Sequence, residues 1–206
     1  PNGMIFRAWS DQTLVLEREF FSVGGGMIEN GRGETLAHTE RPQLEAPFPY
    51  QNMAELHEWC EREKLSIAEV QAFNDNVNLR QIERDDLAVS LWQVMADCID
   101  RGLSSEGELP GGLQVKRRAA RLWQRLLNNS HGDRAPATAA QRAMVYAMAV
   151  NEENAAGGRL VTAPTNGAAG IVPAVLKAHL DEYSLNKKGI DRHVSVFLRT
   201  AAAVGG

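Results

Sequence analysis

The segment from Asn151 to Leu176 constrains the fold most, because it contains the end of one helix and the start of another. Gly157 and Gly158 follow an alanine-rich helical pattern and predict its end, since glycine adopts the left-handed conformation that closes helices. The Leu160–Val161 run is too short for more than an extended connector, and Pro164 favours extended backbone in the residue before it. We therefore expect two helices joined by a short polar turn.

The turn itself has the features of a helix start. Thr165 or Asn166 is expected to cap the second helix, with Gly167 and Gly170 in the turn and Pro173 in the first helical turn. The free N–H groups and the positive dipole end of such a start favour a carboxylate or phosphate. The pattern alone favours an ordinary capped helix without a ligand. Side chains that would add donors are those of Thr162, Thr165 and Asn166.

The N-terminal part has a β character. Residues Gly3–Trp9 and Thr13–Phe21 alternate partially between apolar and polar residues and predict a β-hairpin. The three glycines within Ser22–Gly26 permit close backbone approach or positive φ, although a flexible turn explains them equally. Charges, glycines and prolines between Glu29 and Tyr50 predict irregular chain.

Helical patterns occupy most of the remaining sequence. Ser66 and Glu69 form a capping-box pattern at the start of one helix, and Gly102 is predicted to stop the longest one. The expected helices are Met53–Lys64, Ser66–Val77, Arg80–Arg101, Lys116–Asn129, Pro136–Asn154 and a segment from Ile190 onward.

Two charged groups stand out in these helices. The basic triplet Lys116–Arg118 is expected to form a solvated helix face, with salt bridging to a partner domain as the alternative. Glu152 and Glu153 lie near a helix C-terminus, where they oppose the dipole. That placement suits either contact with solvent or residues held for a site.

The sequence predicts a mainly α fold: a helical domain with an N-terminal β-hairpin, α+β overall and truncated at its C-terminus. We expect a β-hairpin and glycine loop over residues 1–28 and an incomplete helical domain over 29–206. The chain starts at Pro1 without Met and ends inside a helical pattern, which predicts a fragment.

Composition excludes several function classes. A formal net charge of -4 argues against a nucleic-acid or anionic-membrane surface. No apolar run reaches the roughly 18 residues of a membrane helix, and no leader is seen, so we expect a soluble, cytoplasmic protein. Cys60 and Cys98 have no metal-type spacing and are expected to be buried apolar residues.

Several motifs together resemble the iron-sulfur-dependent bacterial L-serine dehydratases. They occur in the same order as in that family: EFFSVGGGMI, PFPY, CIDRGLSSEGELPGGLQVKRRA, AVNEENAAG, GRLVTAPTNGAAGIVPAVL and AAAVGG. The resemblance implies the catalytic α domain of an L-serine ammonia-lyase that converts L-serine to pyruvate and ammonia. It also implies a 4Fe-4S cluster whose open iron acts as a Lewis acid on the substrate hydroxyl, while a protein base takes the α-proton.

The same resemblance assigns residues to the substrate site. Residues implied to bind L-serine are Ser22, Gly24, Gly25, Gly26, Thr162, Thr165, Asn166 and Gly167. Asn151, Glu152, Asn154 and Arg159 are implied to contact these substrate-binding residues rather than the substrate itself. The general base is not identified, and a homodimer is left open.

One position departs from the family pattern. The family turn reads TNGACG, with a cluster-ligating cysteine, whereas this chain has Ala169 at that position. A methyl group cannot replace the thiolate that iron-sulfur clusters require. The family's two other cluster cysteines follow the segment matched here, and an N-terminal domain precedes it. We therefore predict that this polypeptide alone binds no cluster and is catalytically inactive.

Three alternative functions are a pyridoxal-phosphate lyase, a cysteine desulfidase and a non-enzymatic module. A pyridoxal-phosphate lyase needs a Schiff-base lysine, whereas the lysines here lie in helical or charged surface-like stretches. A related cysteine desulfidase would place a thiol where serine has its hydroxyl. A non-enzymatic small-molecule-binding or assembly module would keep the fold without the cluster.

Overall fold

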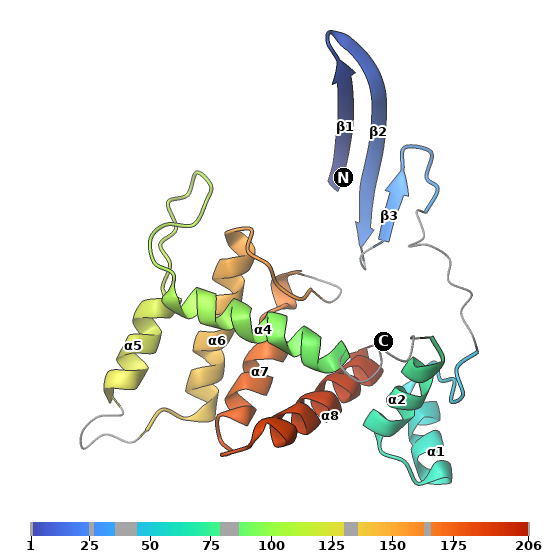
Figure 1. The fold of residues 1–206 in the computed structure, drawn as a ribbon, viewed down its shortest axis with the longest axis vertical. Helices are drawn as coiled ribbons and strands as arrows, with labels where there is room; N and C mark the ends of the chain where they lie inside the picture. Colours follow the sequence, from blue (N-terminus) through green and yellow to red (C-terminus); the bar gives the residue numbers. More distant parts are fainter. Residues whose placement is uncertain are drawn as a thin grey trace. The chain divides into compact units, whose positions relative to one another are not determined.

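The structure is a computed structural model that describes residues 2–24, 27–35, 45–78, 87–129, 136–162 and 166–205 (Figure 1). It divides into two compact units. The first consists of Pro1–Gln43 and Thr162–Ala168, and the second of Leu44–Val161 and Ala169–Gly206.

The first unit contains a three-stranded antiparallel sheet in the order β1-β2-β3. Its strands are β1 (Asn2–Ser10), β2 (Thr13–Gly24) and β3 (Met27–Asn30). The predicted hairpin is confirmed as β1 and β2, with Phe6 opposite Arg18. The third strand was not predicted, because a four-residue strand is stabilised by pairing with its neighbour and has little signal of its own.

The second unit is helical, so the mainly α prediction is confirmed. Its helices are α1 (Met53–Glu63), α2 (Ile67–Asn78), α4 (Leu87–Ser104), α5 (Ala119–Asn129), α6 (Ala139–Ala155), α7 (Ile171–Leu180) and α8 (Lys187–Gly205). The predicted capping box before α2 forms, since Ser66 N donates to Glu69 Oε2 at 2.8 Å. α6 begins at Ala139, after a capping box between Thr138 and Gln141, and not at Pro136 as predicted.

Helices α4, α6 and α7 enclose the main apolar core (Figure 1). Its buried residues are Cys98, Ile99, Tyr146, Val150, Ala174 and Ala178. A second cluster joins α1, α2 and α8 through Leu56, Val70 and Ala203. None of the helices in the described ranges is long and apolar enough to cross a membrane.

Gly102 has a different role from the predicted helix stop. It lies inside α4, which continues to Ser104, and it is buried. A Cβ atom at this position would lie 2.4 Å from the carbonyl oxygen of Ala149 in α6. Only glycine lets the two helices approach this closely, so Gly102 is a packing residue.

Candidate functional site

The chain between α6 and α7 follows the predicted course in part. Gly157 has φ +75° and ends the α6 region, as expected. Asn166–Ala168 forms a short 3-10 helix. The prediction that Asn166 caps the next α-helix is wrong, because this 3-10 turn intervenes and Gly170 is the N-cap of α7. Thr165, the other predicted cap, lies outside the described residues.

The start of α7 has no side-chain cap. The first N–H groups of a helix have no partner within the helix, and Pro173 in the third position has no N–H group. The backbone donors at this end are therefore those of Ile171 and Val172. Such donors, with the positive end of the helix dipole, favour an anion.

Two of the residues that precede α7 are polar and exposed. Thr162 and Asn166 are both exposed, and the Thr162 hydroxyl donates to the Asn166 side-chain oxygen at 2.5 Å. Gly167 is exposed too, and a Cβ there would meet no atom within 4 Å. This segment therefore offers polar groups and open space.

The predicted glycine loop is partly a strand. Ser22 is exposed and pairs with Asn2 and Ile28 in the sheet, while Gly24 is the last residue of β2 and pairs with Met27. Gly25 and Gly26 lie outside the described residues.

Glu152 and Glu153 are buried, so of the two alternatives left open by the sequence, contact with solvent is excluded. The Glu152 carboxylate accepts from Arg118 N at 2.7 Å and from Ala119 N at 3.3 Å. Arg118 directly precedes α5 and Ala119 is its first residue, so the carboxylate satisfies N–H groups at the start of α5 while countering the α5 dipole. Glu152 therefore caps α5 from α6.

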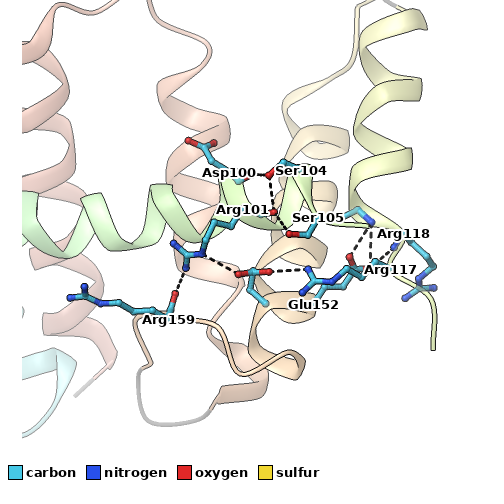
Figure 2. Close-up of polar contacts among 10 residues, drawn as sticks. Asp100, Arg101, Ser104, Ser105, Arg117, Arg118, Glu152 and Arg159 are labelled. Atoms are coloured by element: carbon cyan, nitrogen blue, oxygen red, sulfur yellow. Dashed lines mark hydrogen bonds and ion pairs between the residues drawn. The ribbon is translucent and has the colours of Figure 1, made fainter. Parts of the chain in front are cut away.

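Glu153 is the centre of a charge cluster (Figure 2). Its carboxylate pairs with Arg117 at 2.9 Å and with Arg101 at 3.1 Å. The Arg117 side chain is only 10% exposed, so the expectation of a solvated basic triplet is wrong for this residue. The pairing spans elements far apart in sequence, which is why spacing did not reveal it.

The cluster also holds the chain that follows α6. Arg101 Nη2 donates to the carbonyl oxygen of Arg159 at 2.5 Å, and Gly158 N donates to the Glu153 carbonyl at 2.8 Å. A Cβ at Gly158 would lie 2.7 Å from the Glu153 carboxylate. Figure 2 shows the Arg159 side chain pointing away from this cluster. The direction in which residues 159–161 leave α6 is thus fixed by Arg101 and Glu153.

The other predicted supporting residues take little part in this cluster. Asn151 is exposed at the end of α6, and Asn154 is half-buried with its carbonyl oxygen accepting from Gly157 N at 3.2 Å. Within the described residues, Glu152 and Arg159 are the two of these four whose hydrogen bonds reach other helices, to α5 and α4 respectively.

Comparison with known proteins identifies the family. A family model described as the serine dehydratase alpha chain matches residues 51–206. The chain belongs to this family. L-serine dehydratase TdcG of Escherichia coli (strain K12) is 38% identical over 204 residues, covering 99% of this chain and 44% of the relative. The L-serine dehydratase of Mycobacterium tuberculosis is 41% identical over 206 residues, covering 100% of this chain and 44% of the relative.

A third relative gives the same result. The L-serine dehydratase of Streptomyces coelicolor is 40% identical over 209 residues, covering 99% of this chain and 44% of its own length. The chain therefore spans less than half the length of the curated relatives that it matches.

The donor set of this serine dehydratase alpha-chain member does not fit an iron-sulfur cluster. Ala169 is buried and offers a methyl group. Cys98 is buried in the main core, where burial raises the pKa of its thiol, whereas Cys60 packs against the separate α1–α2–α8 cluster. Within the described ranges, no three His, Cys, Asp or Glu side chains are grouped to hold a metal ion. Clusters need several thiolates at one place, which these residues do not supply.

Proposed function

We propose that this chain is part of an L-serine dehydratase and binds the substrate carboxylate at the start of α7. The observation that carries the proposal is the α7 N-terminus without a side-chain cap, in a chain of the serine dehydratase alpha-chain family. Asn166 and Gly167, which precede α7 in the sequence, are exposed, as is Thr162. A carboxylate fits the backbone N–H groups and the helix dipole at the start of α7.

In the proposed parent reaction, L-serine loses its α-proton and its hydroxyl group, and the aminoacrylate product becomes pyruvate and ammonia. The contribution that we assign to this chain is to hold and orient the carboxylate. Orientation of a bound substrate lowers the entropic part of the barrier. Since Ala169 provides no thiolate, we propose that the chain as given performs no turnover.

A ligand titration tests the binding proposal. Isotope-labelled protein is titrated with L-serine and with ethanolamine, which lacks the carboxylate, while backbone NMR shifts are followed. We expect saturable shifts at Ile171 and Val172 with L-serine only. Asn166→Ala should weaken binding, whereas Asn128→Ala, at an exposed position on α5, should not. Equal responses to both compounds, or shifts elsewhere in the chain, would contradict the proposal.

Ala169 favours a second candidate, a non-enzymatic binding or assembly module that retains the fold. The two are separated by Ala169→Cys in the full-length protein that carries this chain. Recovered production of pyruvate from L-serine supports a disabled dehydratase, and continued inactivity with retained serine binding supports the module. Sulfide release from L-cysteine in the same variant would instead identify a desulfidase.

Four further expectations stand as proposals beside these. They are a cytoplasmic location, a homodimer, support of the substrate site by Asn151, Glu152, Asn154 and Arg159, and a division between residues 1–28 and 29–206. Gel filtration with light scattering measures the oligomeric state directly.

A further inference from the structure

The loop between α4 and α5 has an ordered shape. Leu109 N donates to Val115 O at 2.7 Å, and Arg117 N donates to Gly107 O at 2.8 Å, so the two arms of the loop pair with each other. Gly107 has φ +98°, a conformation that favours glycine. At the end of the loop next to α5, the Arg117 side chain forms an ion pair with Glu153. The loop therefore presents its side chains from a fixed backbone.

A pocket of about 490 Å³ lies between this loop and the first turns of α5. This volume is within the range of small-molecule sites, roughly 300–1,000 Å³. Charged side chains dominate its lining: Glu106, Glu108, Lys116, Arg117, Arg118 and Arg121. The concentration of cations is notable in a chain with a net charge of -4.

Two carboxylates already pair with some of the positive and hydrogen-bond-donating groups near this pocket. Glu153 pairs with Arg117, and Glu152 accepts from the first N–H groups of α5. Figure 2 shows the Arg118 side chain directed away from Glu152. In the described part of the chain, no hydrogen bond or ion pair is found for the side chains of Lys116, Arg118 and Arg121.

The two carboxylates of the pocket are equally unpaired within the described residues. No ion pair within 4.0 Å joins Glu106 or Glu108 to the cations of the same pocket. The pocket thus has three cations and two carboxylates, and within the described residues none of them forms an ion pair with another. A small ligand that carries both a strong anion and a cation would satisfy both groups.

We propose that this pocket binds a small phosphate monoester that also carries an amino group. A phosphate is favoured over a single carboxylate because it carries close to two negative charges and offers three acceptor oxygens to several cations. The guanidinium groups of Arg118 and Arg121 suit phosphate oxygens geometrically. The ammonium group would lie toward Glu106 and Glu108. This site is separate from the proposed serine site and does not depend on it.

The experiment uses O-phosphoethanolamine as the probe. Ethyl phosphate, which lacks the amino group, and ethanolamine, which lacks the phosphate group, are the comparison compounds. Binding is measured by calorimetry and by NMR shifts at near-physiological salt. We expect saturable binding of O-phosphoethanolamine, weaker binding of ethyl phosphate and none of ethanolamine. Equal affinity for sulfate, or no saturable binding of O-phosphoethanolamine, would overturn the proposal.

Variants that remove single charges distinguish a specific binding site from non-specific electrostatic attraction. Arg121→Gln should weaken binding by about tenfold, since it removes one charge-assisted contact. Arg125→Gln is the matched control, because Arg125 is exposed on the same helix but does not line the pocket. Glu108→Gln should reduce the preference for O-phosphoethanolamine over ethyl phosphate. Equal weakening by Arg121→Gln and Arg125→Gln, with unchanged circular dichroism in both, would refute the site.

Discussion

Replacing Glu153 with glutamine should destabilise the helical unit strongly. The Glu153 and Arg117 side chains are only 7% and 10% exposed, so their ion pair is largely shielded from water. Glu153→Gln keeps the size of the side chain but leaves Arg117 charged and buried without a counter-ion. Breaking a buried pair on one side costs about 3–5 kcal/mol. Loss of the Arg101–Glu153 pair adds little to this cost, since Arg101 is 43% exposed and its charge is screened by solvent.

We take about 3 kcal/mol as the expected loss, at the lower end of that range, because glutamine keeps one acceptor oxygen. For a chain of 206 residues this corresponds to a fall in Tm of roughly 6–12 °C. Urea denaturation followed by far-UV circular dichroism measures the free energy of unfolding, and a thermal scan measures Tm.

The control is Glu63→Gln, whose carboxylate pairs with Arg62 at the surface, where the two side chains are 40% and 52% exposed. A loss below about 1 kcal/mol is expected there. Adding Arg117→Met to Glu153→Gln should recover part of the stability, because it removes the unpaired cation. If Glu153→Gln costs no more than Glu63→Gln, the buried-pair reasoning is wrong.

Two further perturbations test the packing of α4. Gly102→Ala should destabilise the protein by about 1–3 kcal/mol in a urea titration, because its methyl group would overlap the Ala149 carbonyl of α6. Gly112→Ala is the control, since its methyl group would meet no atom within 4 Å and should leave the stability unchanged. Burial raises the pKa of the Cys98 thiol, so less thiolate is present at pH 8. Iodoacetamide followed by mass spectrometry should therefore label Cys98 far more slowly than Cys60, and equal native-state rates would contradict the burial.

Local features of the fold were predictable from sequence. The capping box of Ser66 and Glu69 and the helix end at Gly157 depend on neighbouring residues, and both appear as expected. β3 was not predicted, because its stability depends on the partner strand. Gly102 was misjudged as a helix stop, since nothing in the α4 sequence indicates that α6 passes directly beside it.

The candidate site was predictable to a smaller extent. The turn before α7 was located correctly, but the capping role of Asn166 was wrong because a 3-10 turn precedes the helix. The Glu153 cluster was missed, since its partners Arg117 and Arg101 are 36 and 52 positions away along the chain. Pairings of this length have no spacing rule from which to predict them.

This separation has a consequence for the order in which the protein folds during synthesis. Arg101 and Arg117 leave the ribosome before Glu153, and the 36 positions after Arg117 take about 2–7 s to add at bacterial to eukaryotic elongation rates of roughly 5–20 residues per second. During that interval Glu153 has not yet been added, so both arginines are hydrated and the loop before α5 is not held by the Arg117–Glu153 ion pair. The α4–loop–α5 segment therefore completes its structure only when α6 arrives, and a nascent chain stalled before Glu153 should expose this segment to proteases.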